Sequence, residues 1–151
     1  MISQFDDRTR RIVLSGPIGE EISAVFIEQL SALECLNVSD VTVIISSFGG
    51  CVHSCMAIYD AMKTCFCPIT TVGIGKVMSA AILLLACGDK GKRFITQNAR
   101  CLIHPSSGGA LGDLQAMETS VKEMRVMQDM YMNLLSKETG MPMKKLEKDM
   151  S

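Results

Sequence analysis

The segment from Val41 to Ser46 is an almost unbroken run of β-branched residues, and it most restricts what this chain can fold into. A run of that composition is typical of a strand buried on both faces of a parallel sheet. Gly49 and Gly50 follow it and predict a turn. The run therefore favours an α/β domain, in which helices pack against a largely parallel sheet.

The rest of the chain alternates short apolar runs with segments of helical periodicity. The expected strands are 12–15, 41–46, 69–74, 94–96 and 101–103, and the expected helices are 22–33, 51–63, 79–87, 113–137 and a last one from Pro142. Asp113 is placed to cap the long amphipathic helix and Gly140 to end it. The methionine-rich stripe on that helix suits either a subunit interface or a core-facing side.

Composition excludes several classes of function. Lys and Arg total 15 against 16 Asp and Glu, so the chain has no cationic excess with which to bind nucleic acid. The most apolar stretch, 77–87, is about half of the ~20 residues that a membrane helix needs. No apolar leader is visible at the start of the sequence. We expect a soluble, cytoplasmic protein with no membrane and no nucleic-acid partner.

The cysteines are odd in number and follow no signal peptide, which speaks against a disulfide framework. They are Cys35, Cys51, Cys55, Cys65, Cys67, Cys87 and Cys101. Two close groupings invite a metal site, but neither has the C-x2-C spacing of common zinc modules. Small buried side chains are the simpler interpretation, and we expect no metal and no cofactor.

Two glycine-containing segments are the candidates for chemistry. Ser46–Gly50 directly follows the apolar strand, and its backbone N–H groups could face an anion or a developing oxyanion. An ordinary turn is the alternative. In the second segment, 73–82, a strand leads into a helix at Ser79. Ser79 suits either a helix N-cap or a nucleophile, with the N–H of Ala80 beside it.

A nucleophilic serine needs a base, and the chain has two histidines. His104 ends an apolar run beside a glycine-rich stretch, a position that would hold an imidazole at the edge of a cleft. His53 falls on a predicted helix. A structural hydrogen bond is the alternative role for either histidine, so the pairing of Ser79 with His104 is a hypothesis that rests on chemistry rather than on spacing.

Several motifs in one order resemble the ClpP family, the proteolytic subunits of Clp proteases. Ser47–Gly50 is similar to the family's Ser-Pro-Gly-Gly turn, and Gly75–Ser79 to the segment that carries its nucleophile. The other matching segments are Met56–Asp60, Gly91–Phe94, Leu102–His104 and Gly108–Gly112. The resemblance runs from about Arg11 to the end of the sequence, with the spacing between motifs preserved.

The resemblance implies a crotonase-like α/β fold, with repeated β-β-α units in a spiral and a protruding handle helix at 113–137. It implies a serine endopeptidase that hydrolyses peptide bonds of unfolded proteins through an acyl-enzyme. By position, Ser79 would be the nucleophile and His104 the general base. The backbone N–H groups of Gly50 and Ala80 would form the oxyanion hole.

The resemblance also implies partners. Family members assemble as heptameric rings that stack into a homo-oligomeric tetradecamer, and an AAA+ unfoldase such as ClpX or ClpA feeds them unfolded polypeptide. The unfoldase uses ATP, so the peptidase chain would need no cofactor of its own.

The sequence also departs from the family pattern. The triad acid of the family falls just beyond Ser151, so we expect a single peptidase domain, 1–151, that is truncated at its C-terminus and short at its N-terminus. Phe48 replaces a proline, and His104–Ser106 replaces His-Gln-Pro. Two other functions stay open: a catalytically inactive ClpP-like subunit of a mixed ring, and a crotonase-fold enzyme that acts on acyl-CoA thioesters.

Overall fold

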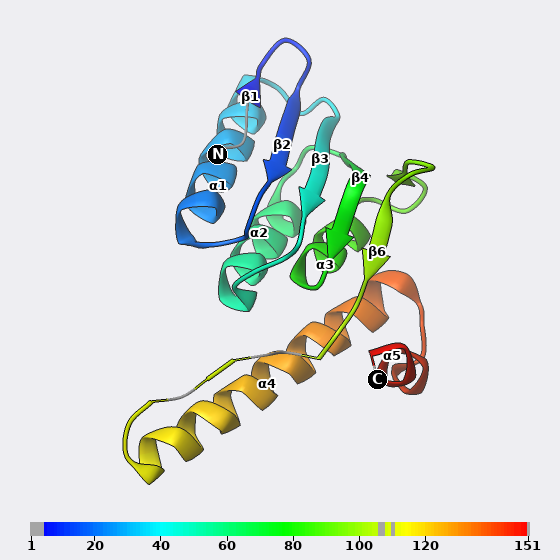
Figure 1. The fold of residues 1–151 in the computed structure, drawn as a ribbon. Helices are drawn as coiled ribbons and strands as arrows, with labels where there is room; N and C mark the ends of the chain where they lie inside the picture. The colour runs from blue at the N-terminus through cyan, green and yellow to red at the C-terminus, as the bar shows by residue number, and fades with distance from the viewer. Residues whose placement is uncertain (1–4, 106–107, 110, 151) are drawn as a thin grey trace. The chain divides into compact units, whose positions relative to one another are not determined.

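The computed structural model describes residues 5–105, 108–109 and 111–150, in two compact units, 1–102 and 103–151. The first unit holds β1 (Phe5–Asp6), β2 (Arg11–Ser15), α1 (Glu20–Leu36), β3 (Val41–Ser47), α2 (Val52–Thr64), β4 (Ile69–Met78), α3 (Ala80–Ala86), β5 (Arg93–Ile95) and β6 (Arg100–Leu102). The second holds α4 (Leu114–Thr139) and α5 (Met143–Met150). Figure 1 shows these elements along the chain. The prediction of a single domain is not tested by this division.

The six strands of the first unit form one sheet in the order β1-β2-β3-β4-β5, with β6 also paired to β4. Every pairing is parallel except that of β1 with β2. The predicted largely parallel sheet is therefore confirmed. Strand β1, which is two residues long, was not predicted.

Strand β3 corrects one expectation. Its residues alternate between buried and half-buried, although the sequence predicted burial on both faces. The reason is that α1, α2 and α3 pack side by side as one layer over one face of the sheet (Figure 1). Val41, Val43 and Ile45 are fully buried, while Ile44 on the opposite face is not.

Strand β4 is longer than predicted, because it continues through Gly73 and Gly75 to Met78. Its first half pairs with β5 and its second half with β6. The register between β3 and β4 shifts after Ile45, so the extra length is absorbed by an irregularity. As a result, Ser79 follows a strand end directly instead of a loop.

In the second unit both predicted caps of the long helix are present. Asp113 accepts a hydrogen bond from the N–H of Ala116 at 2.8 Å, and Gly140 adopts the left-handed conformation with φ 73°. Most of the exposed apolar residues of α4 lie in its first half, with Met130 as an exception, and its buried apolar residues lie in the second half. Among the described residues, no helix combines the length and the apolarity that crossing a bilayer requires.

Candidate active site

Ser79 connects β4 to α3 in an uncommon backbone conformation, with φ 53° and ψ −129°. A positive φ is rare for a residue with a side chain and costs about 1–3 kcal/mol. Ser79 occupies the N-cap position of α3, as the alternative interpretation expected, but its side chain makes no capping hydrogen bond to the helix. A strained serine at a sharp strand-to-helix turn is the arrangement by which hydrolases expose a nucleophilic hydroxyl.

Gly49 lies directly against this turn. A Cβ atom added there would lie 2.8 Å from both the Ser79 Cβ and the Met78 carbonyl oxygen, and 3.0 Å from the Ala80 nitrogen. Gly49 also has φ 93°, which favours glycine. The tandem glycines therefore allow the Ser46–Gly50 segment to contact the segment around Ser79. An ordinary turn after β3 would not need such a contact.

The Gly49–Gly50 turn is held in place by backbone and side-chain hydrogen bonds. Ser47 Oγ donates to the Gly16 carbonyl at 2.5 Å and accepts from the Gly49 N–H at 3.0 Å. Ile18 donates its N–H to the Gly49 carbonyl at 2.9 Å and accepts from the Cys51 N–H at 2.8 Å. This support comes from β3 and from the loop before α1, so the rigid sheet fixes the position of the turn.

Two backbone N–H groups, those of Gly50 and Ala80, lie near this turn. The bridge between Ile18 and Gly50 is made by hydrogen bonds from Ile18 to the Gly49 carbonyl and from the Cys51 N–H to Ile18. The Gly50 N–H takes no part in these two hydrogen bonds. Ala80 is the first residue of α3, where an N–H has no acceptor within the helix. Gly49 contacts Ser79 and Ala80, so both N–H groups belong to one backbone cluster.

His104 lies in the second unit. Its Nδ1 is 2.7 Å from the carbonyl oxygen of Pro105. A carbonyl can only accept, so this hydrogen bond requires the proton on Nδ1 and leaves the lone pair on Nε2. The Ser79 N–H donates to the Leu102 carbonyl at 2.8 Å, at the end of the first unit. The pairing of Ser79 with His104 stays a prediction. The other histidine, His53, is exposed on α2.

The comparison with protein families agrees with this geometry. The sequence model of the Clp protease family matches residues 2–151. The chain belongs to the Clp protease family. Among solved structures it is similar to a ClpP1 point mutant from Listeria monocytogenes, with 29% identity and a TM-score of 0.88. That match covers 96% of this chain and 81% of the other.

This membership confirms the fold class inferred from the motifs, including the handle helix, which is α4. It also gives the kind of protein: a ClpP-type chain of the serine protease class. Neither comparison tests the roles of Ser79, His104, Gly50 and Ala80, which we take up below as a proposal.

Some neighbours of the Ser79 turn were missed by the sequence analysis. The cysteines were interpreted as buried side chains, which is right for Cys55, Cys67 and Cys87 and wrong for the others: Cys65 is half-buried, and Cys35, Cys101 and Cys51, which lies beside Gly50, are exposed. The backbone N–H of Ser54 lowers the pKa of the Cys51 thiol, whereas burial raises the pKa of the Cys55 thiol to about 12. A cysteine at the start of a helix is the signal that would have predicted this difference.

A second missed feature is a contact between Phe48 and Lys76. The Lys76 ammonium lies over the Phe48 ring, 4.4 Å from its centroid. Phe48 was noted because it stands where the Clp protease family has proline. Lys76 was part of the Gly75–Ser79 motif, but its contact with Phe48 was not predicted, because the expected strand stopped at residue 74.

Proposed function

We propose that this Clp protease family member is an endopeptidase that cleaves unfolded polypeptides through an acyl-enzyme on Ser79. The observation that carries the proposal is the strained conformation of Ser79, with φ 53°, packed against Gly49 at the end of β4. Strain of this kind persists where the surrounding structure enforces it, and it is common at catalytic turns.

In the proposed reaction the Ser79 hydroxyl oxygen attacks the carbonyl carbon of the scissile bond, and His104 takes the hydroxyl proton. The N–H groups of Gly50 and Ala80 stabilise the resulting oxyanion. The tetrahedral intermediate collapses to the acyl-enzyme, and the leaving amine takes the proton from His104. Water then attacks the ester in the same way, which releases the acid and restores Ser79.

The hydrogen bond at His104 supports its role as the base. The Pro105 carbonyl accepts from Nδ1 and so favours the tautomer in which Nε2 is basic. In a serine triad an acidic residue performs this orienting role. Here the Pro105 backbone carbonyl favours the same tautomer of His104.

The proposal includes the assembly that the family resemblance implies. The chain would form heptameric rings that stack through their handle helices, and an AAA+ unfoldase would supply substrate in the cytoplasm. The exposed apolar side chains on the first half of α4, such as Leu114, Met117 and Val121, support a role for that helix in assembly.

The test is hydrolysis of a quenched fluorescent peptide by the wild-type chain and by Ser79→Ala and His104→Ala variants. Ser120→Ala is the matched control, because Ser120 is an exposed serine on α4 whose hydroxyl donates to the Ala116 carbonyl at 3.0 Å. We expect the two site variants to lose activity and the control to keep it. Activity that survives Ser79→Ala would contradict the proposal. Ring assembly without any hydrolysis would favour the inactive subunit of a mixed ring.

A further inference from the structure

Two cationic side chains lie next to each other close to the Ser79 turn. Lys76 on β4 is the register partner of Arg100 on β6. Paired residues of adjacent strands project from the same face of a sheet, with strands about 4.8 Å apart. Like charges so placed repel, so the pair needs another reason to be there.

Neither cation has an acidic partner within residues 5–105, 108–109 and 111–150. Lys76 contacts the Phe48 ring, and Arg100, which is exposed, makes no side-chain hydrogen bond or ion pair in that part of the chain. Most other cations in the first unit are engaged, as Arg10, Lys92 and Arg93 are. The Lys76–Arg100 pair is therefore a local excess of positive charge on a chain of net charge −1.

The pair lies within reach of a peptide bound at Ser79. Met78, two residues after Lys76, precedes Ser79 and pairs with Leu102, whose carbonyl accepts the Ser79 N–H. Three residues of extended chain span about 10 Å. A substrate in extended conformation rises about 3.3 Å per residue. A side chain two to four residues from the scissile bond can therefore reach the cations.

Phe48 holds one side of this place. Phe48 is 64% exposed although it adjoins Gly49, which contacts Ser79. A ring face under an ammonium restricts the lysine and leaves its other side open to an anion. The ring also offers an apolar wall for the stem of a glutamate side chain.

We propose that Lys76, Arg100 and Phe48 form a substrate subsite that selects peptides with an aspartate or glutamate a few residues from the bond cleaved at Ser79. The inference rests on the proposed function, because it concerns the substrate of that site. The expected ligand is a single carboxylate on a peptide. A polyanion would need a larger cationic surface, and the chain as a whole carries no cationic excess.

The test measures binding without hydrolysis, in the Ser79→Ala background. Two fluorescein-labelled peptides share a central leucine and differ at one position three residues away from it, where one has glutamate and the other glutamine. Binding of each peptide to the protein is titrated by fluorescence polarisation. We expect the glutamate peptide to bind about three- to tenfold more tightly, as two partly exposed ion pairs allow. The preference should vanish in Lys76→Gln/Arg100→Gln and persist in Lys90→Gln, which neutralises an exposed lysine elsewhere. It should also shrink at 1 M salt, where the screening length falls to about 3 Å.

A charge reversal guards against a trivial loss of folding. Lys76→Glu/Arg100→Glu should turn the preference toward a lysine-containing peptide while the thermal midpoint stays close to that of the parent. Equal affinity for the glutamate and glutamine peptides, or binding of neither, would overturn the subsite. Failure of the proposed function would be seen in a different measurement. In that case the wild-type chain would show no Ser79-dependent hydrolysis of the glutamine peptide.

Discussion

Arg10 and Ser79 share a backbone feature and differ in almost everything else. They are the non-glycine residues with positive φ in the described part of the chain, at 51° and 53°. Arg10 precedes β2, where strands of the parallel sheet begin, and Ser79 follows the end of β4. Comparing them separates a strained residue that its own side chain stabilises from one for which we propose a chemical role.

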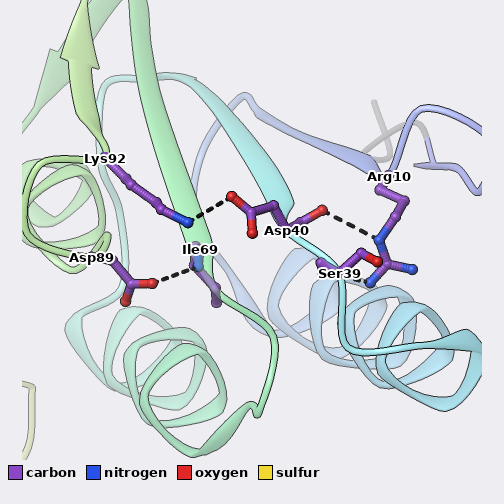
Figure 2. A network of polar contacts seen from close by, with 6 residues as sticks. All are labelled: Arg10, Ser39, Asp40, Ile69, Asp89 and Lys92. Carbon is purple, nitrogen blue, oxygen red and sulfur yellow. Dashed lines mark hydrogen bonds and ion pairs between the residues drawn. The ribbon is translucent and has the colours of Figure 1, made fainter.

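The strain at Arg10 is offset by contacts of its own side chain. The guanidinium donates to four backbone carbonyls, at distances of 2.9–3.2 Å. These acceptors belong to Leu33, Asn37, Ser39 and Asp40. Figure 2 shows the Arg10 end of this network together with the Lys92–Asp40 ion pair and the hydrogen bond from the Ile69 N–H to Asp89. Arg10, the residue before β2, is thus hydrogen-bonded to the end of α1 and to the segment that leads into β3.

The Ser79 side chain makes no capping hydrogen bond to α3. What holds its backbone is the neighbouring structure: the close approach of Gly49 and the hydrogen bond to Leu102. The carboxyl ends of parallel strands are where α/β proteins place their sites, and the opposite ends contribute mainly to stability. The proposed roles of the two residues would follow this division.

The largest expected effect separates the two roles. Ser79→Ala should lower kcat/KM by a factor of about 10³ or more, because the nucleophile is removed. Its free energy of unfolding should change by less than about 0.5 kcal/mol. Peptide hydrolysis and chemical denaturation measure the two quantities, and a large loss of stability would place Ser79 in the same class as Arg10.

Arg10→Ala should give the opposite result. Four carbonyls lose a charged donor, so we expect the free energy of unfolding to fall by about 2–4 kcal/mol. Activity per folded molecule should stay the same. Arg10→Lys is the matched control: it keeps the charge but cannot reach all four acceptors, and its loss should be intermediate. A drop in activity without a drop in stability would reverse the assignment.

Gly49→Ala should damage both properties. The new Cβ would crowd the Met78 carbonyl and Ser79 at 2.8 Å, in a backbone with φ 93°. We expect a loss of about 2–3 kcal/mol in stability together with slower acylation. Gly91→Ala is the control, since Gly91 has φ 83° but nothing within 4 Å of the added Cβ. It should lose only about 1 kcal/mol and keep its activity.

Glycine substitutions isolate the backbone strain that the two residues share. Ser79→Gly should be about 1 kcal/mol more stable than Ser79→Ala, because glycine adopts positive φ without a penalty. The same difference is expected between Arg10→Gly and Arg10→Ala. Thermal denaturation of the four variants measures both gaps, and the absence of either gap would mean that no strain is stored at that position.

The smallest effect is expected at the periphery of the Arg10 network. Lys92 pairs with Asp40 at 2.6 Å, but both side chains are more than a third exposed. Lys92→Met should therefore cost at most about 1 kcal/mol, and high salt should reduce the difference. A larger, salt-independent loss would show that the ion pair is more tightly coupled to Arg10 than its exposure suggests.

The sequence predicted the elements well where one pattern dominated. The β-branched run forms β3, and Asp113 and Gly140 cap the two ends of α4 as predicted. It placed the end of β4 too early, because Gly73 and Gly75 are turn residues by local chemistry and are held extended here by pairing with β3, β5 and β6. The register shift that permits this has no local signal.

The candidate site was predictable only in part. Motif order singled out Ser79, Gly50, Ala80 and His104, but the contact of Gly49 with Ser79 joins residues thirty positions apart. The role of Arg10 was equally hidden, since its acceptors are backbone carbonyls of residues 33–40. Contacts to backbone atoms leave no pattern of side chains, so a single sequence does not reveal them.

The most direct test of the central claim is labelling with a fluorophosphonate probe, read by intact mass and peptide mapping. We expect one adduct per chain on Ser79, absent in Ser79→Ala and retained in Arg10→Lys under conditions where that variant is folded. An activated Ser79 would then have the oxyanion donors and the base that its position implies. An adduct on another residue, or none on a folded wild-type chain, would contradict the claim that the strained turn presents a nucleophile.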